Sequence, residues 1–221
     1  MAPPDADIYP EATGPAIETV KAHQTPAPLK LYAGWFCPFV QRVWVVLEEK
    51  RIPYQYIEVN PYHKPASLLA LNPRGLVPTL EHAGKPLYES TVVADFLDDA
   101  YPGHGAALHP RDPYEKARQR IWMEYVTSRI IPAFHRFLQF QVRQWVFDEF
   151  KGGSGIPKEG EAGDDAVWKR WRKYADAIES RESFRKTTSE AEHYRPLYKR
   201  YADDIAQSEL AKSIRAGRGV V

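Results

Sequence analysis

The sequence predicts an α/β domain over residues 29–102 and an all-α region over residues 115–221. In the first region, strand-like and helix-like segments follow one another in the order β-α-β-α-β-β-α. The second region shows helical patterns, and residues 103–114 between the two are rich in proline and glycine, which is typical of an interdomain linker. Residues 1–28 are rich in proline, alanine and charge without a period, so we expect a mobile or loosely docked tail.

The α/β domain begins with a strand, a helix and a second strand. Leu29–Ala33 is a short apolar run, and Pro38–Lys50 has a helical pattern. Pro53–Val59 alternates and is rich in aromatic and β-branched residues, which favours a strand. Because a helix joins the two strands, we expect them to pair in parallel.

The domain continues with a short helix, a hairpin and a longer helix. Lys64–Leu71 can form the short helix. Val77–His82 and Pro86–Tyr88 flank the turn residues Ala83–Lys85, a pattern typical of an antiparallel hairpin. Glu89–Leu97 is expected to be the last helix of the domain.

The C-terminal region is expected to contain three long helical stretches. The first is Tyr114–Phe150, broken near Pro132, because proline removes a backbone donor. A glycine-rich, charged loop follows over Lys151–Asp165. Helical patterns resume over Ala166–Glu182 and Ser189–Arg215, the second of them interrupted by Pro196.

The composition is that of a soluble globular protein. The chain has 221 residues, 43% of them hydrophobic, and a formal net charge of +1. This small charge argues against a nucleic-acid partner, and no apolar run approaches the roughly 20 residues of a membrane span. The first residues lack the basic start and apolar centre of a signal peptide. With a single cysteine in the chain, we expect a cytoplasmic protein without nucleic-acid or membrane partners.

Cys37 is the only cysteine and the strongest candidate for a catalytic residue. It falls at the predicted N-cap of the helix that begins at Pro38, where unpaired N–H groups and the positive end of the helix dipole stabilise a thiolate. We therefore expect its pKa to lie well below that of a free cysteine and the thiolate to be a nucleophile. The alternative is a buried structural cysteine that packs as a small apolar residue.

A lone cysteine also limits the chemistry. It cannot form a disulfide within the chain or build a cysteine-based zinc site, and no metal is expected. If Cys37 forms a mixed disulfide, the resolving thiol comes from outside, and a small thiol such as glutathione is the natural candidate.

Three further segments carry candidate binding residues. Pro78 interrupts a strand-like run, and a cis bond there would turn the Val77 backbone toward an extended peptide ligand, although trans is the commoner state. Ser90 and Glu89, at a predicted helix start, suit a carboxylate and an ammonium group, and Lys64 suits a carboxylate. The alternatives are an ordinary helix start with an acidic first turn and a solvated lysine.

The order and spacing of these motifs resemble the N-terminal domain of a glutathione transferase, a thioredoxin-like fold. The matching segments are Phe36–Phe39, Asn72–Leu80 and Tyr88–Ser90. The Cys-Pro-Phe motif followed by Arg42 resembles the omega class of the family. Arg111–Ala117 also resembles the start of the family's helical domain, and Tyr194–Ala202 resembles the last helix of fungal members.

The resemblance implies roles for the site residues. Cys37 would be the nucleophile that forms a mixed disulfide with glutathione, and Phe39 would lie against the cysteinyl part of that ligand. Val77 would bind its backbone, with Pro78 in the cis form. Trp35, beside the thiol, is expected to help form the wall of the second-substrate pocket, and a core or surface tryptophan is the alternative.

The two ends of glutathione are assigned in the same way. Glu89 and Ser90 would hold the γ-glutamyl end, and Lys64 would hold the glycine carboxylate. One departure concerns the helical domain, which usually carries a Ser/Thr-x-x-Asp box in a central helix. No such segment occurs between Pro132 and Asp165, so we expect a shortened helical domain.

The sequence thus predicts an omega-like glutathione transferase that performs thiol transfer or deglutathionylation, with dehydroascorbate reduction by the same mechanism. The expected partners are glutathione and a small disulfide or electrophilic substrate, with a homodimer as a further possibility. The alternatives are conjugation of glutathione to electrophiles and a non-catalytic binding or regulatory protein with the same fold.

Overall fold

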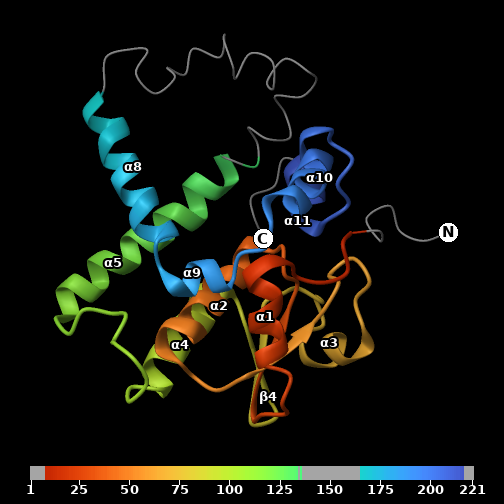
Figure 1. The fold of residues 1–221 in the computed structure, drawn as a ribbon, viewed down its shortest axis with the longest axis horizontal. Helices are drawn as coiled ribbons and strands as arrows, with labels where there is room; N and C mark the ends of the chain where they lie inside the picture. Colours follow the sequence, from red (N-terminus) through yellow and green to blue (C-terminus); the bar gives the residue numbers. More distant parts are fainter. Residues whose placement is uncertain (1–7, 134, 136–164, 217–221) are drawn as a thin grey trace.

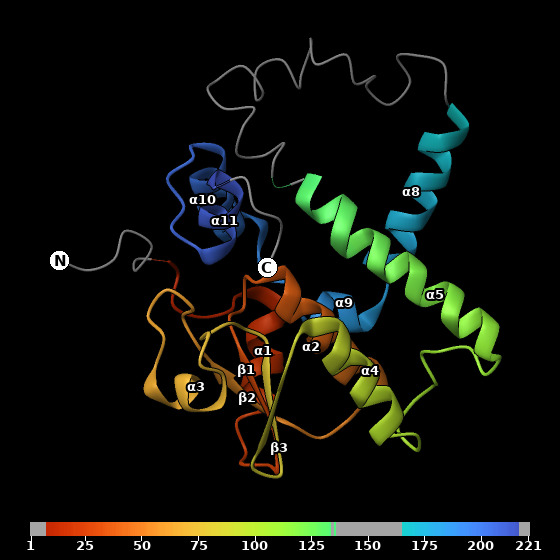
Figure 2. The ribbon, with the colours of Figure 1, turned by 180° about the vertical axis from the view of Figure 1, so that it is seen from behind.

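The computed structural model describes residues 8–133, 135 and 165–216. A mixed four-stranded sheet with the strand order β2-β1-β3-β4 forms the centre of the first domain (Figures 1 and 2). β1 (Leu29–Ala33) runs parallel to β2 (Gln55–Glu58) and antiparallel to β3 (Thr79–His82). β3 pairs antiparallel with β4 (Lys85–Tyr88). The predicted parallel pair and the predicted hairpin are both confirmed.

The hairpin turn is tighter than expected. Ala83 and Gly84 have φ values of 49° and 80°, so both central residues of the turn are left-handed, as in two-residue hairpin loops. Lys85, expected in the turn, is the first residue of β4 and pairs with His82.

Helices cover both faces of the sheet. α2 (Pro38–Lys50) and α4 (Ser90–Ala100) pack against each other on one face, and α3 (Ala66–Leu71) lies on the other. Successive side chains of β1 alternate accordingly, because strand side chains point to opposite faces. Leu31 belongs to the core beneath α2, whereas Tyr32 packs with Leu68 of α3.

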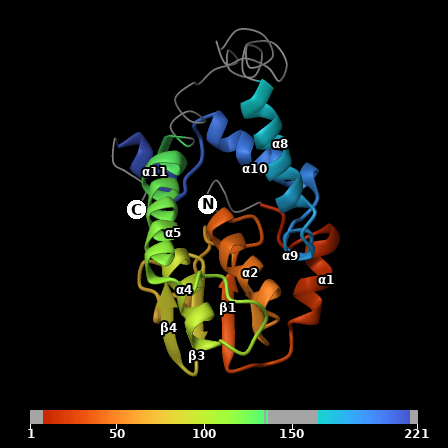
Figure 3. The ribbon, with the colours of Figure 1, turned by 90° about the vertical axis from the view of Figure 1, so that its left-hand side faces the viewer.

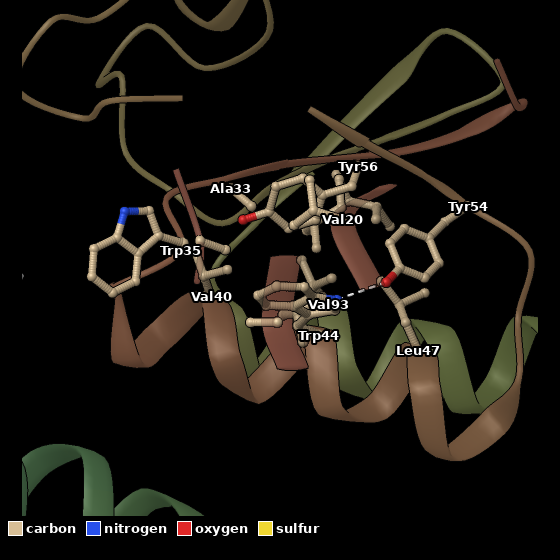
Figure 4. Close-up of a cluster of buried hydrophobic side chains, with 14 of the residues drawn as sticks. Val20, Ala33, Trp35, Val40, Trp44, Leu47, Tyr54, Tyr56 and Val93 are labelled. Carbon is tan, nitrogen blue, oxygen red and sulfur yellow. Dashed lines mark hydrogen bonds between the residues drawn. The ribbon is translucent and has the colours of Figure 1, made fainter. Parts of the chain in front are cut away.

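The main core lies between the sheet and α2. Trp44 and Leu47 of α2 are fully buried, and Tyr56 of β2 is 1% exposed (Figure 4). The indole N–H of Trp44 donates to the hydroxyl of Tyr54 over 2.6 Å, so a polar atom in this core has a partner (Figure 4).

The expectation of a loose tail is wrong for residues 14–22. This segment forms α1 (Gly14–Ala22), and its side chains Ala16 and Val20 are 0% and 8% exposed. The hydroxyl of Thr19 donates to the carbonyl of Lys186 over 2.8 Å. The contacts that bury α1 thus come from residues far along the chain, which a local pattern does not reveal.

The all-α part begins with α5 (Pro113–Tyr125), capped by the Asp112 side chain, which accepts from the N–H of Glu115. A π-helical segment, η1 (Val126–Ile130), follows directly. It ends just before Pro132, which lacks a backbone donor, so the hydrogen-bond pattern changes where the sequence predicts a break. The expected helix beyond residue 135, the Lys151–Asp165 loop up to residue 164 and the missing central box lie outside the described residues.

Four helices complete the described chain: α8 (Asp165–Glu179), α9 (Glu182–Lys186), α10 (Ala191–Ala202) and α11 (Glu209–Arg215). α9 packs against α1 and α2 (Figure 1). The predicted interruption at Pro196 is wrong, since α10 continues through it. The break comes at Asp204, whose φ of 55° is left-handed. No helix in the described ranges is long and apolar enough to cross a membrane.

Candidate active site

Cys37 is the N-cap of α2, as predicted, and Pro38 is the first helical residue. The backbone N–H of Cys37 donates to the carbonyl of Gly34 over 2.9 Å, which closes the turn between β1 and α2. The thiol is half-buried, and its Sγ donates to the carbonyl of Val77 at 3.7 Å. Val77 belongs to the segment Leu76–Pro78 that leads into β3, here called the strap. The local sequence thus places the sulfur at a helix N-terminus and beside an extended backbone segment.

The electrostatic balance at this thiol differs from the expectation. Burial raises the pKa of Cys37 above its ordinary value, and it outweighs the backbone N–H groups of Val40 and Phe39 and the charge of Arg42, which lower it. The bond to the Val77 carbonyl also favours the protonated form, because a thiolate cannot donate. The prediction of a lowered pKa is therefore wrong, because it considered the helix terminus and omitted the desolvation of the thiol.

A cavity of about 1040 Å³ opens beside Cys37. It is lined by all but one of the site residues predicted from the sequence: Cys37, Phe39, Lys64, Val77, Pro78, Glu89 and Ser90. They come from α2, the segment before α3, the strap before β3 and the start of α4. The structure therefore brings together residues spread over more than fifty positions of the sequence.

Trp35 is the exception, and the prediction that it helps to form the second-substrate pocket is wrong. Its side chain is 2% exposed and belongs to the core rather than to the cavity lining. The indole N–H donates to the carbonyl of Tyr9 over 2.9 Å, and the ring meets Phe36 and Tyr194 edge-on (Figure 4 shows Trp35 at the end of the cluster). The alternative of a core tryptophan is the correct one.

The strap before β3 has the form that the resemblance implies, because the Val77–Pro78 peptide bond is cis. Pro78 precedes the first residue of β3, Thr79, so its missing N–H does not interrupt the sheet. The amide of Asn72 donates to the carbonyl of Leu76 and to the hydroxyl of Thr79. These two hydrogen bonds fix the backbone on either side of Val77 and Pro78.

Charged and polar side chains at the rim of the cavity already form an ion pair and hydrogen bonds with one another or with the backbone. Glu89 is the N-cap of α4 with a left-handed φ of 73°, and its carboxylate accepts from the Arg74 guanidinium at 3.1 Å. Ser90, 8% exposed, accepts from the Arg42 guanidinium at 3.4 Å. Lys64 donates to the carbonyl of Arg74 over 2.9 Å. Carboxylate, hydroxyl and ammonium groups therefore lie at separate points of the cavity that the thiol also lines.

Known proteins match this arrangement. Residues 36–100 fit the family model for the glutathione S-transferase N-terminal domain. The chain is 43% identical over 112 residues to glutathione S-transferase omega-1 of Sus scrofa, covering 50% of this chain and 45% of that protein. It is 43% identical over 110 residues to the probable glutathione S-transferase GSTU6 of Oryza sativa subsp. japonica, covering 48% and 47%. The chain thus spans about half the length of these curated relatives.

A solved structure extends the likeness over nearly the whole chain. Glutathione transferase Omega 3C from Trametes versicolor is 38% identical, with a TM-score of 0.73, covering 90% of this chain and all of that one. The chain belongs to the glutathione transferase family. Glutathione is the co-substrate of this family, so the cavity beside Cys37 is a candidate glutathione site.

Aromatic side chains that the sequence did not predict line one side of this transferase cavity. Tyr62, Tyr198 and Tyr201 line it, and the hydroxyls of Tyr62 and Tyr201 lie 3.3 Å apart. Phe36 stacks on Tyr62 with ring centroids 6.0 Å apart. Burial, together with the nearby Cys37, raises the pKa of Tyr198, so its hydroxyl stays protonated. The spacing of Tyr194, Tyr198 and Tyr201, which share one helical face, is the signal that could have indicated them.

Within the described ranges, one surface group could offer metal ligands. The ligand atoms of Glu190, Glu192 and His193 lie within 4.8 Å of one another at the start of α10. Both carboxylates are exposed, and none of the three residues lines the transferase cavity. Exposed acidic groups of this kind are common without an ion, and the chemistry of Cys37 does not involve them.

Proposed function

We propose that this glutathione transferase performs thiol transfer through Cys37. The observation that carries the proposal is the position of its thiol, which caps α2 and faces a cavity with charged groups for both ends of a peptide. Because the chain has no second cysteine, the thiol that resolves a mixed disulfide comes from the ligand.

The proposed cycle has two exchanges. The Cys37 thiolate attacks the glutathionyl sulfur of a mixed disulfide, which forms a Cys37–glutathione disulfide and releases the acceptor thiolate. A second glutathione thiolate then attacks that bond, which yields oxidised glutathione and restores the Cys37 thiolate. In the net reaction one free glutathione thiol is oxidised into the new disulfide as the acceptor sulfur is reduced to a thiol, so the electrons balance. Reduction of dehydroascorbate would instead take two electrons from two free glutathione thiols, which end as oxidised glutathione.

The cavity supplies a pose for the tripeptide. Val77 would pair with the cysteinyl backbone and place the glutathione sulfur near Cys37, with Phe39 against the cysteinyl part. Glu89 would bind the ammonium group, Ser90 the γ-glutamyl carboxylate, and Lys64 the glycine carboxylate. Proton loss from Cys37 is then part of the barrier, because burial favours the thiol. The N–H groups of Phe39 and Val40 stabilise the thiolate once it forms.

A panel of three reactions tests the proposal: reduction of a glutathionyl mixed disulfide, reduction of dehydroascorbate and conjugation of glutathione to an aryl halide. We expect the first to be the fastest. Cys37→Ser should reduce it to the uncatalysed rate while glutathione still binds, because a serine hydroxyl is too weakly ionised for disulfide exchange. Lys116→Met, at the surface, is the matched control. Mixed-disulfide reduction that survives in Cys37→Ser would contradict thiol transfer through Cys37, and the absence of all three activities would favour a binding protein.

We also propose that the protein is a homodimer in the cytoplasm. Large apolar side chains of α4 and α5 are exposed, with Val92 at 54%, Ile121 at 67% and Trp122 at 64%. Such side chains favour burial against a second copy of the chain. Sedimentation equilibrium should give twice the mass of the chain, and Trp122→Lys should raise the dissociation constant. A monomer at all concentrations would contradict this assembly, and cell fractionation tests the location.

A further inference from the structure

The turn that leads from β1 to Cys37 is attached to the end of β2 by two hydrogen bonds. The N–H of Val59 donates to the carbonyl of Ala33 over 2.7 Å. The N–H of Trp35 donates to Oε1 of Glu58 over 3.1 Å. The first bond joins two backbone groups and does not respond to pH. The second ends on a side chain that can gain a proton, so its strength depends on the ionisation of Glu58.

The rest of this turn fits closely against its surroundings. A Cβ at Gly34 would come within 3.1 Å of the carbonyl of Val59. The indole of Trp35 is buried, and its N–H donates to the carbonyl of Tyr9. The backbone N–H of Cys37 donates to the carbonyl of Gly34 over 2.9 Å. Only two residues separate the amide that Glu58 binds from the nucleophile, so a displacement of that amide reaches the sulfur.

No cation pairs with Glu58 in the described part of the chain. Its Oε2 is buried without a hydrogen-bond partner there, and so is the hydroxyl of Tyr56, two residues earlier on β2. Burial is the strongest influence on the ionisation of Glu58 and raises its pKa to about 7, and the charge of Glu11, before α1, adds to the rise. The N–H of Trp35 and the hydroxyl of Tyr56 oppose it. Acid and carboxylate are therefore both present near neutral pH.

We propose that Glu58 is a positioning residue for the Cys37 nucleophile whose carboxylate form fixes the turn and whose acid form loosens it, an inference that rests on the proposed thiol-transfer function. A charge-assisted hydrogen bond is roughly twice as strong as a neutral one, so the ionised side chain holds the Trp35 amide more firmly. Disulfide exchange needs the attacking sulfur in line with the bond that breaks, and a misplacement of about 1 Å can cost about 10²-fold in rate. Turnover therefore falls more steeply below pH 7 than loss of the thiolate alone explains.

A purely electrostatic role for Glu58 predicts the opposite sign. A carboxylate near Cys37 disfavours the thiolate, because like charges repel, so its ionisation would slow the reaction. Tyr56 is influenced by both groups: burial raises the pKa of its hydroxyl, and the charges of Glu58 and Cys37 add to the rise. Alkylation by iodoacetamide, a small neutral reagent, measures the thiolate fraction. Turnover of a bound disulfide also measures the position of the sulfur, so the two assays together separate the roles.

Glu58→Gln tests the proposal, because its amide oxygen can accept from Trp35 but never carries the charge. At about pH 5.5 both proteins hold a neutral group at this position, so kcat for reduction of a glutathionyl mixed disulfide should be equal. At about pH 8 the wild type should be about threefold to tenfold faster, the range for a charge-assisted over a neutral hydrogen bond. The pH profile of iodoacetamide alkylation should be the same in both. Glu58→Ala, without an acceptor, should be slower than either at both pH values.

Glu81→Gln is the matched control. Glu81 lies on β3 of the same sheet, accepts from Lys30 over 3.0 Å and does not line the cavity, so this variant should match the wild type at both pH values. Thermal unfolding at each pH verifies that every protein compared is folded at the assay temperature. Glu58→Gln remains decisive if Glu58→Ala does not fold, because it keeps the acceptor.

The outcomes separate failure of this inference from failure of the proposed function. If the wild type is active but its ratio to Glu58→Gln is the same at both pH values, the positioning role of Glu58 is wrong and the proposed function stands. A variant that is faster at pH 8, with alkylation shifted to lower pH, would show the electrostatic role and also overturn the proposal. If the wild type reduces no mixed disulfide at either pH, the proposed function fails, and this inference with it.

Discussion

The sheet domain and the pair of helices α5 and α8 contain similar kinds of apolar side chains but bury them very differently. Leu31, Trp44 and Leu80 of the sheet domain are fully buried. α5 has no buried residue, and Trp122 on it is 64% exposed, as Trp171 on α8 is 59% exposed. Figure 3 shows both helices extending beyond the sheet domain. Aromatic content alone therefore does not produce a core, because burial also requires a second packed layer.

The later helices belong with the sheet domain in this comparison. Leu197 of α10 is 5% exposed and joins the main core. Arg181, just before α9, forms two bonds of 2.8 Å with the carboxylate of Glu49 on α2. In the helical region, α9 thus packs against α1 and α2, and α10 joins the main core through Leu197, whereas α5 and α8 leave their tryptophans exposed.

The largest expected difference is in the free energy of unfolding. It should distinguish two neighbouring ion pairs, one buried in the sheet domain and one exposed at the start of the helical region. Lys50, 1% exposed, donates to Asp98 over 2.7 Å at the C-terminal end of α4, and that carboxylate also accepts from the N–H groups of Leu108 and His109. Lys50→Met should lower the free energy of unfolding by about 3–5 kcal/mol, because it leaves a buried carboxylate unpaired. Urea unfolding measures the change.

Lys116 provides the matched control for that variant. It pairs with Asp99, the next residue of α4, but at 3.5 Å and with the carboxylate side chain 65% exposed. Lys116→Met should change stability by less than about 1 kcal/mol, as exposed pairs contribute little. Equal effects of the two variants would show that the junction between α4 and α5 is as tightly packed as the sheet core and would break the comparison.

Hydrogen exchange provides the second test. Amides around Leu31, Ile57 and Thr79 should exchange only by global unfolding, whereas α5 and α8 should open locally, because few of their side chains are buried. We expect the two sets to differ by roughly 10²-fold or more in protection. Mass spectrometry of peptides after timed labelling measures both at once. Equal protection would show that the helices close a complete core in solution.

The sequence was informative wherever local chemistry decides the outcome. The position of Cys37 before Pro38 predicted the N-cap, and the turn residues predicted the hairpin. Features set by residues far along the chain were missed, such as the burial of α1 against α9 and the inward direction of Trp35. The prediction of a lowered pKa for Cys37 was wrong for the same reason, because desolvation depends on the tertiary packing around the sulfur.

Glu58 is another group whose state depends on packing. It ends β2, and its Oε1 accepts from the backbone N–H of Trp35 over 3.1 Å, in the turn that leads to Cys37. Its Oε2 is buried and has no hydrogen-bond partner among the described residues. Burial raises the pKa of Glu58 to about 7, and the charge of Glu11 adds to the rise. A carboxyl inside the sheet domain is thus half-protonated near neutral pH.

The raised pKa of Glu58 gives the smallest effect predicted for a buried group, and this effect depends on pH. Between roughly pH 4.3, where a glutamate ionises in the unfolded chain, and about pH 7, the unfolded state is charged and the folded state is not, so stability falls as pH rises. Glu58→Gln keeps an acceptor for Trp35 without the charge. Thermal unfolding should show the variant equal to wild type at acid pH and more stable by about 1–3 kcal/mol at pH 8. A stability difference that is the same at both pH values would mean that Glu58 stays ionised, and that the sheet domain is more open to water at this turn than its packing indicates.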